Sequence, residues 1–380
     1  MKRGREKGEK IMMETKLVLL GTGTPNACPD ASGPSSAVVV GDRAYLVDFG
    51  PGVVRQAAKA YRNGIDALRP DRLVTAFCTH LHTDHTAGYP DLIFTPWVLE
   101  RKEPLRLFGP KGIRDMTEHL LKAYKVDIDF RINGFEKANE VGYRVETQEI
   151  TSGVIYRDDR VTVEAFPVSH GTLESYGFKF TTPDRVIVIS GDTAPLEIVA
   201  EKAKGCDILL HEVEYTAGLA AREPKWQKYH REVHTLSVDL AEIAKKARPK
   251  LLVTYHRIYH MEIQDNTVDV GAEMARRNEA ILEEIRNAGY EGPVVNGMAG
   301  GCLASAGAYH WSRSAYQKSV RTGCIESGYQ RKYPVPKCIF TDCAAVSTRN
   351  QNSYYQRENR WILYPYHAQN DGRIWRGSSV

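Results

Sequence analysis

The sequence of 380 residues lacks three features that would each narrow its class. It has no apolar run of the roughly 18 to 20 residues that a membrane-spanning helix needs. The short apolar stretch Ile11-Met12-Met13 is followed by Glu14 and Lys16, so it makes a poor signal peptide. The seven cysteines form no CxxC pair and no regular framework. We therefore expect reduced thiols, a cytoplasmic location and no membrane partner.

A strong charge of one sign is also absent from most of the chain. Residues 1–16 carry six Lys and Arg against three Glu, and residues 298–380 carry eleven basic residues against four acidic ones. Because the whole chain has a net charge of +4, residues 17–297 have a net charge of −6. A mildly acidic body is a poor electrostatic match for a nucleic acid, which is a polyanion.

The C-terminal segment is poor in Leu, Ile and Val but holds eight of the twenty Tyr, three of the five Trp and four of the seven Cys. Its apolar positions follow neither a helical nor an alternating period, which is typical of segments that pack no core. Its aromatic and basic residues also suit stacking on single-stranded nucleic acid, and a read-through extension is a further alternative. We therefore expect a basic extension at residues 1–15, a main domain at residues 16–297 and a poorly ordered tail at residues 298–380.

The order of the expected elements predicts an α/β fold. Hairpin strands come first, and later strands alternate with helices, which favours sheets covered by helices over a helical bundle. The expected strands are 16–20, 37–40, 45–47, 73–78, 161–168, 177–181, 185–190, 207–210, 251–255 and 293–296. The expected helices are 53–62, 113–124, 195–204, 236–247 and 272–287.

A cluster of potential metal ligands follows the expected strand 73–78. It reads Thr79-His80-Leu81-His82-Thr83-Asp84-His85, with three imidazoles and one carboxylate within six positions. His and Asp are poor core residues, and neutral imidazole and carboxylate are the usual ligands of Zn²⁺ and similar ions. The sequence therefore predicts a metal site, with a hydrogen-bonded polar loop as the structural alternative.

Three more potential ligands lie where other expected strands end. His170, Asp192 and His256 follow the strands 161–168, 185–190 and 251–255. Strand ends at one rim of a sheet are where α/β folds gather functional groups from distant parts of a chain. The total of seven candidates is enough for two metal sites. Asp48, after the strand 45–47, is a candidate to orient a metal-bound histidine.

These residues resemble the ordered ligand motifs of the metallo-β-lactamase superfamily: His80-x-His82-x-Asp84-His85, His170, Ser190-Gly191-Asp192-Thr193 and His256. The similarity runs from about Lys16 to Asn296 and implies a four-layer αββα sandwich. The resemblance places His80, His82 and His170 on one metal ion, Asp84, His85 and His256 on another, and Asp192 between them. Two divalent ions are implied, Zn²⁺ first, with Mn²⁺ or Fe as alternatives.

The resemblance also implies catalytic roles. The nucleophile would be a metal-bound hydroxide, oriented or deprotonated by Asp84. The pairs His211-Glu212 and His234-Thr235 resemble motifs of the branch that contains the arylsulfatase-type enzymes and ribonuclease Z. By that analogy His234 is the general acid and Glu212 fixes its orientation. The structural alternative is that His211 and His230 are hydrogen-bonded groups near the rim and that His234 is a helix-start residue. His260 is expected at the surface.

The substrate is predicted from two departures from ribonuclease Z. Only 22 residues separate His170 from Asp192, which leaves no room for the long tRNA-gripping arm, and no PxKxRN motif follows Pro25. Trp97, Tyr176 and Trp226 are candidate walls of a pocket for an aromatic group, with a core role as the alternative.

The main hypothesis is therefore an arylsulfatase-like zinc hydrolase that cleaves a small sulfate ester or phosphodiester. The first alternative is a tRNA 3′-end processing endoribonuclease, and the second is a non-catalytic metal-binding or nucleic-acid-binding protein. A small-molecule ester is the expected partner. Nucleic acid is allowed but not favoured, and a homodimer is allowed.

Overall fold

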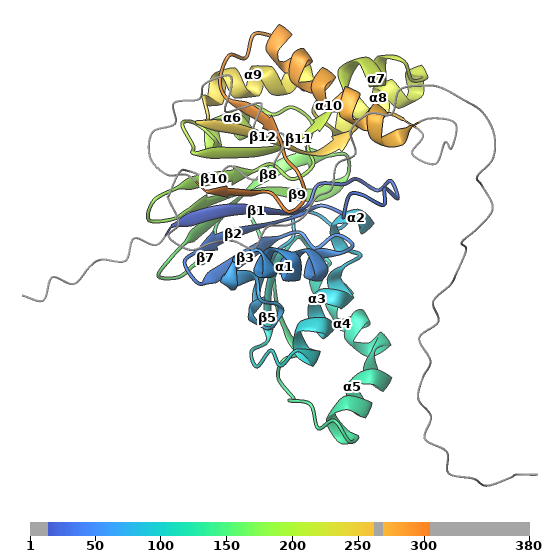
Figure 1. The fold of residues 1–380 in the computed structure, drawn as a ribbon, viewed down its shortest axis with the longest axis vertical. Helices are drawn as coiled ribbons and strands as arrows, with labels where there is room; N and C mark the ends of the chain where they lie inside the picture. The colour runs from blue at the N-terminus through green and yellow to red at the C-terminus, as the bar shows by residue number, and fades with distance from the viewer. Residues whose placement is uncertain (1–13, 262–268, 305–380) are drawn as a thin grey trace, which may run out of the picture. The chain divides into compact units, whose positions relative to one another are not determined.

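The computed structural model describes residues 14–261 and 269–304. The expectations for residues 1–13 and for most of the tail, from residue 305 onward, lie outside the described residues. Within the described ranges, two seven-stranded sheets pack face to face, and helices cover the outer face of each sheet (Figure 1). The predicted four-layer αββα sandwich is confirmed.

The first sheet has the strand order β14-β1-β2-β3-β4-β5-β6. Its hairpin of β2 and β3 turns at Gly41 and Asp42, as the sequence predicts, and β3 to β6 run parallel. Strand β14 lies beyond the expected end of the main domain at residue 297 and pairs with β1. The strands are β1 (Thr15–Gly21), β2 (Ser35–Val40), β3 (Arg43–Val47), β4 (Thr75–Phe77), β5 (Leu105–Gly109), β6 (Val145–Glu149) and β14 (Cys302–Ala304).

The second sheet has the strand order β13-β12-β11-β10-β9-β8-β7. Strands β7 to β10 form antiparallel pairs, and β10 to β13 run parallel. The strands are β7 (Gly153–Arg157), β8 (Thr162–His170), β9 (Leu173–Thr181), β10 (Val186–Ile189), β11 (Ile208–Glu214), β12 (Leu251–Ile258) and β13 (Val294–Asn296).

Three apolar cores separate the four layers. The central core lies between the sheets and contains Phe77, Phe178 and Phe180, whose rings contact one another. The other two cores lie between each sheet and its helices. Helices on the side of the first sheet are α1 (Val53–Arg62), α2 (Thr83–Thr86), α3 (Tyr89–Val98), α4 (Ile113–Ala123) and α5 (Lys125–Asn133). Helices on the side of the second sheet are α6 (Glu197–Lys202), α7 (Thr216–Ala220), α8 (Pro224–Val233), α9 (Ser237–Ala247) and α10 (Val270–Asn287).

The element boundaries differ from the sequence predictions mainly at strand ends. The helix predicted at 53–62 is found unchanged, but the one predicted at 195–204 is only α6, because Leu196 is still extended. Strands β11 and β12 run four and three residues past their predicted ends at 210 and 255. The polar side chains at these strand ends are buried. A prediction based on hydropathy therefore ends each strand at its last apolar residue, which is too early.

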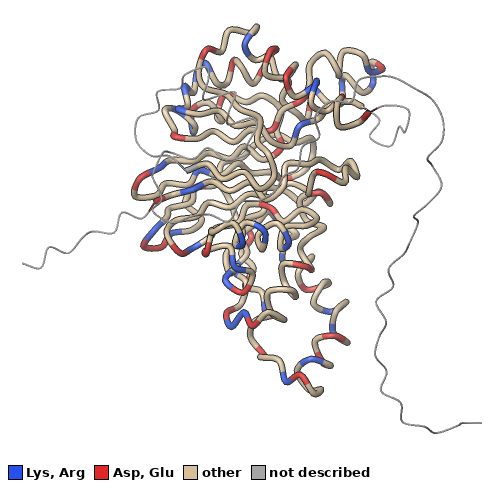
Figure 2. The backbone as a smooth tube through the Cα atoms, viewed as in Figure 1, with Lys and Arg blue, Asp and Glu red and all other residues tan. Residues whose placement is uncertain are grey.

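The surface carries no single-sign face in the view of Figure 2, where Lys and Arg are interspersed with Asp and Glu along the elements. Among the described residues, no helix is both long and apolar enough to cross a membrane. The carboxyl ends of β3, β4, β10, β11 and β12 meet at one rim of the sandwich. Buried polar side chains are concentrated at this rim.

Candidate metal centre

Asp48 fixes the loop that carries the histidine cluster. It follows β3, and its carboxylate accepts hydrogen bonds from the backbone N–H and the Oγ1 of Thr79, at 2.8 and 3.0 Å. Its Oδ2 also accepts a hydrogen bond of 2.9 Å from Nδ1 of His85. Because Thr79 Oγ1 donates to Asp48, it accepts from Nδ1 of His80, 3.0 Å away. Asp48 thus sets the tautomers of His80 and His85, leaving the Nε2 lone pair of each free.

Three histidines form the first ligand group. Nδ1 of His82 lies 3.1 Å from Nε2 of His80 and 3.1 Å from Nε2 of His170. His170, the last residue of β8, donates its Nδ1–H to the carbonyl oxygen of Val233 over 2.7 Å, so its Nε2 lone pair also faces the group. Burial lowers the pKa of all three side chains, which keeps the imidazoles neutral as a metal ligand must be.

The second ligand group contains a carboxylate and two histidines. Oδ2 of Asp84 lies 3.2 Å from Nε2 of His256 and 3.6 Å from Nε2 of His85. Oδ2 of Asp192 lies 3.2 Å from His256, 3.4 Å from His85 and 4.0 Å from Nε2 of His80. Asp192 Oδ2 thus lies within 4.0 Å of an Nε2 atom from each group, and the bridging role that the family resemblance implies for Asp192 stays a prediction.

His256 reaches this position through a β-bulge. In the pairing of β11 with β12, Glu212 lies opposite Tyr255 and the next residue, Val213, lies opposite Arg257, so His256 is the extra residue. Its φ of 44° is in the left-handed region. A bulge re-aims a side chain at the edge of a sheet, and strained residues concentrate at functional sites.

The donor set fits divalent metal ions. Nε2 of His85 and Oδ1 of Asp192 are buried without a hydrogen-bond partner, although buried polar atoms normally have one. Ligand bonds of about 2.0–2.2 Å in a tetrahedral site place ligand atoms roughly 3.3–3.6 Å apart. The separations in both groups are close to these values. The residues therefore suit two neighbouring ions that share Asp192.

Glu212 and His234 form a buried pair beside the ligands. Nδ1 of His234 donates to Oε2 of Glu212 over 2.9 Å, and the backbone N–H of Thr193 donates to Oε1 over 2.6 Å. The ring of His234 lies 5.0 Å from that of His170 and 5.9 Å from that of His256. Burial, and then the charge of Asp192, raise the pKa of Glu212, whereas burial lowers the pKa of His234. The two groups can therefore share a proton at the edge of the metal centre.

Two expectations about nearby residues are wrong. His260 is not at the surface: its side chain is buried and its Nε2 bonds to Oε1 of Glu214 over 2.5 Å. Trp97 is not a pocket wall, because it is buried beneath the first sheet and donates to the carbonyl oxygen of Asn139. The sequence analysis also missed Glu214 itself, whose spacing of two from Glu212 on β11 places both on the same face of the strand.

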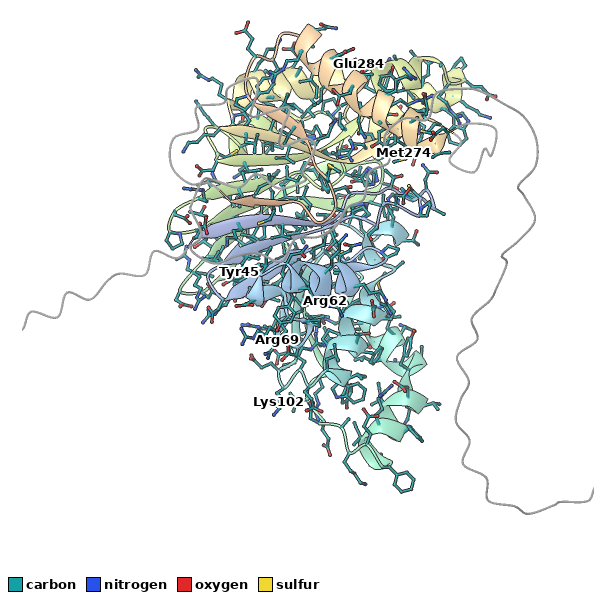
Figure 3. The ribbon with its side chains drawn as sticks, viewed as in Figure 1. Tyr45, Arg62, Arg69, Lys102, Met274 and Glu284 are labelled. Atoms are coloured by element: carbon teal, nitrogen blue, oxygen red, sulfur yellow. The ribbon has the colours of Figure 1, made fainter. Side chains whose placement is uncertain are left out.

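Two cavities differ in their relation to the centre. One of about 520 Å³ is lined by the first glycine turn and by α2, including Thr24, Asn26 and Asp84, so it opens beside the ligands. Another of about 760 Å³ lies at the opposite ends of β3 and β4, lined by Tyr45, Arg69 and Lys102 (Figure 3). Only the first is placed to admit a substrate to the cluster.

A family model now decides the class of the protein. The model described as "Beta-lactamase superfamily domain" matches residues 43–257, a span that includes all seven candidate ligands. The chain belongs to the metallo-β-lactamase superfamily. A relative named ribonuclease Z, from Mycobacterium sp. (strain KMS), is 36% identical over 251 residues, which cover 63% of this chain and 83% of that protein. The family match and the ribonuclease Z relative together make the chain a metal-dependent hydrolase that acts on ester bonds.

Two solved structures share the metallo-β-lactamase fold with this chain. The fold protein YhfI from Bacillus subtilis matches with a TM-score of 0.57 and 15% identity, covering 77% of this chain and 100% of that one. The short form of human tRNase Z matches with a TM-score of 0.54 and 20% identity, covering 76% and 98%. At these identities the likeness supports the fold alone.

Proposed function

We propose that this hydrolase is an endoribonuclease that processes the 3′ ends of tRNA precursors, with two divalent ions as cofactors. The observation that carries the proposal is the grouping of six other candidate ligands around Asp192, at a rim that also holds the Glu212–His234 pair. The ribonuclease Z relative, at 36% identity over most of its length, supports RNA as the substrate class. This reverses the preference for a small sulfate ester that the sequence alone suggested.

The metal ions would be held by the two ligand groups described above. When bound, a pair of divalent ions lowers the pKa of water and stabilises negative charge on a phosphate oxygen. Histidine and carboxylate donors at these separations favour Zn²⁺. Asp84, a member of the second group, also lies beside the cavity of about 520 Å³, where its carboxylate can orient the attacking water.

The remaining chemistry falls to residues of the chain. Hydrolysis forms a bond from a water oxygen to phosphorus and breaks the bond from phosphorus to the leaving oxygen, which must take up a proton. Protonated His234 supplies this proton from Nε2, because its Nδ1–H is held by Glu212 and its ring lies beside the ligand histidines. The proton that the attacking water loses passes to bulk solvent, which returns a proton to His234 for the next turnover. Glu212 positions the ring and stabilises the charge that His234 carries before the transfer.

A second candidate function, hydrolysis of a small sulfate ester or phosphodiester, is favoured by the short connection between His170 and Asp192. The 21 residues between these ligands contain β9 and β10, so the tRNA-gripping arm is absent here. The cavity beside Asp84 also suits a small molecule. A ribonuclease with this connection must contact RNA through another part of its surface.

A substrate panel tests the proposal. Purified protein loaded with Zn²⁺ is incubated with a tRNA precursor that carries a 3′ trailer, with bis-p-nitrophenyl phosphate and with p-nitrophenyl sulfate. We expect endonucleolytic cleavage of the precursor, with weaker hydrolysis of the chromogenic phosphodiester. Hydrolysis of the sulfate ester with an intact precursor would instead establish the small-ester function.

A further inference from the structure

Helix α8 presents two exposed aromatic rings next to the candidate general acid. Trp226 and Tyr229 are 40% and 46% exposed, large fractions for such apolar side chains. Together with His230 they occupy positions i, i+3 and i+4, which lie on one face of a helix. The proposed reaction does not use either ring, and neither contributes to the cores.

A series of ring contacts connects this face to the metal centre. Tyr229 lies 5.3 Å from His230 and 6.2 Å from Trp226, measured between ring centroids. His230 lies 5.6 Å from His234, whose ring in turn lies 5.0 Å from the candidate ligand His170. Trp226 lies 6.5 Å from His230, so two ring contacts connect it to the candidate general acid.

The C-terminal half of α8 is anchored through the side chain of His230. Nδ1 of His230 lies 3.0 Å from Oε1 of Glu214, a fully buried carboxylate that also bonds to His260. Burial raises the pKa of Glu214, but the hydrogen bonds and charges of His230 and His260 lower it by more. The pKa of Glu214 is therefore below its usual value, and the carboxylate is anionic. The backbone N–H of His234 donates to the carbonyl oxygen of His230. The exposed rings therefore project from an anchored helix, so that less conformational entropy is lost when they bind a ligand.

Basic side chains accompany the rings. Lys225 Nζ lies 5.5 Å from the centre of the Trp226 ring, and Lys228 and Arg231 are exposed on the same helix. Residues 224–233 contain these three basic residues and one acidic residue, Glu232, in a body that is otherwise acidic. Aromatic faces interleaved with cations are the usual surface for single-stranded nucleic acid.

We propose that α8 binds single-stranded nucleotides of the RNA substrate beside the scissile phosphodiester. Trp226 and Tyr229 stack on bases, while Lys225 and Lys228 contact phosphates. This inference rests on the proposed ribonuclease function, and it identifies the surface that replaces the absent arm. A polynucleotide spans the distance from His234 to Trp226.

Two assays of the full-length protein test the surface. One is cleavage of the tRNA precursor, and the other is binding of a fluorescent single-stranded RNA oligonucleotide. Because stacking contributes about 1–3 kcal/mol per base, Trp226→Ala is expected to raise KM and the oligonucleotide Kd roughly 5- to 100-fold. Trp226→Phe should recover most of the affinity. For Trp226→Ala, the factor by which kcat/KM falls should be at least fivefold smaller on bis-p-nitrophenyl phosphate than on RNA.

Phe130→Ala is the matched control, because Phe130 is a 66% exposed ring on α5, on the side of the other sheet. It should bind and cleave RNA like the wild type. If the wild type cleaves RNA and Trp226→Ala behaves like Phe130→Ala, the α8 surface is refuted while the ribonuclease function stands. If the wild type binds the oligonucleotide through Trp226 but cleaves no RNA, the ribonuclease function fails and the surface stands. Absence of oligonucleotide binding by the wild type refutes the α8 surface, and absence of precursor cleavage refutes the ribonuclease function.

Discussion

His234 is the side chain on which the proposed proton transfer depends. Its Nδ1 is occupied by Glu212, and its ring is buried between His170 and His256. His234 also lies within ligand distance of His170 and Asp192 and of Glu212 and His256, but the two ligand groups described above are complete without it. Removal of His234 should therefore separate proton donation from metal binding, which no change at a ligand can do.

The first prediction is that His234→Ala lowers kcat on an RNA substrate roughly 10²- to 10³-fold while bound metal is unchanged. An ester whose leaving group is p-nitrophenolate needs no proton from the protein, so activity on bis-p-nitrophenyl phosphate should fall far less. Glu212→Gln should show the same pattern in milder form. Equal losses on both substrates would argue against a general acid, and metal loss would show that His234 is a ligand.

Asp158 is a second residue with a testable role, remote from the centre. Its carboxylate accepts hydrogen bonds from Tyr45 Oη (Figure 3), Tyr156 Oη and two backbone N–H groups, and it lies 3.1 Å from Arg43. These contacts link β3 of the first sheet to the turn between β7 and β8 of the second. Burial raises the pKa of Asp158, but the hydrogen bonds, that of Tyr45 first, lower it more, so the folded-state pKa is below the unfolded value.

A group with a lowered folded-state pKa stabilises the fold above its unfolded pKa, and this stabilisation is lost as the pH falls through the folded pKa. Asp158→Asn should therefore lower the Tm at pH 7, and its difference from the wild type should shrink below about pH 3.9, the unperturbed value for Asp. Thermal unfolding over a pH series measures this. A difference that is constant from pH 7 to pH 2 would exclude a charge effect.

At the scale of elements, the loop after β3 and the segment that begins with α2 are in close backbone contact. A Cβ atom on Gly50 would meet the carbonyl oxygen of Asp84 at 2.4 Å and the backbone of Gly33 at 2.5 Å. Both contacts are with backbone, which cannot move aside as a flexible side chain can. Glycine at position 50 therefore allows Asp84 and its neighbours to approach Asp48.

Gly50→Ala should accordingly destabilise the protein by about 1–3 kcal/mol and reduce the bound metal. Gly271→Ala is the control, because its Cβ would meet only Asp269 Oδ1, at 3.5 Å, and alanine favours the helix α10. Denaturant unfolding with metal analysis measures both effects. A Gly50→Ala variant as stable as Gly271→Ala would show that the close approach is not required.

Element by element, the sequence predicted what local patterns determine. The cluster from His80 to His85 and the strand-end positions of His170 and Asp192 are visible as motifs after apolar runs. The β-bulge at His256 is not, because it depends on pairing with β11. Helix α3 contains Pro90 and Pro96, which weaken any helical prediction, and its stability comes from burial against the first sheet.

The proposed role of helix α8 also could not be predicted from local sequence patterns. The sequence predicts Trp226 only as a candidate pocket wall, and it is the fold that places α8 beside His234, through the contact of His230 with Glu214. A buried carboxylate that anchors a helix has no sequence signature of its own. The preference for a sulfate ester likewise came from features that the chain lacks, and absent features do not reveal which surface replaces them.

For the whole molecule, the metal centre joins the two sheets. His80, His82, Asp84 and His85 follow β4 of the first sheet, whereas His170, Asp192 and His256 belong to strands of the second sheet or follow them. Ligands from both sides must come together before an ion can bind. Metal binding therefore stabilises the native contact between the sheets and has little effect on the unfolded chain.

Chelation should consequently lower the Tm by about 8–16 °C, since a ligand at about a thousand times its Kd contributes roughly 4 kcal/mol and each kcal/mol shifts Tm by about 2–4 °C in a large domain. The Tm of Asp192→Asn should fall less on chelation, because this variant lacks the carboxylate shared by both ligand groups and so binds less metal. Thermal unfolding with and without chelator, followed by restoration with Zn²⁺, measures the effect. An unchanged Tm in the fully stripped wild type would argue against a structural coupling of the sheets through metal.

The most direct test of the central claim is cleavage of a tRNA precursor by the purified full-length protein, with bound metal quantified in the same sample. We predict about two divalent ions per chain and a single endonucleolytic cut at the 3′ trailer. In Asp192→Asn the cut should be lost and the bound metal lowered, and chelation of the wild type should abolish the cut. A metal-loaded protein that leaves the precursor intact while hydrolysing p-nitrophenyl sulfate would contradict the proposal.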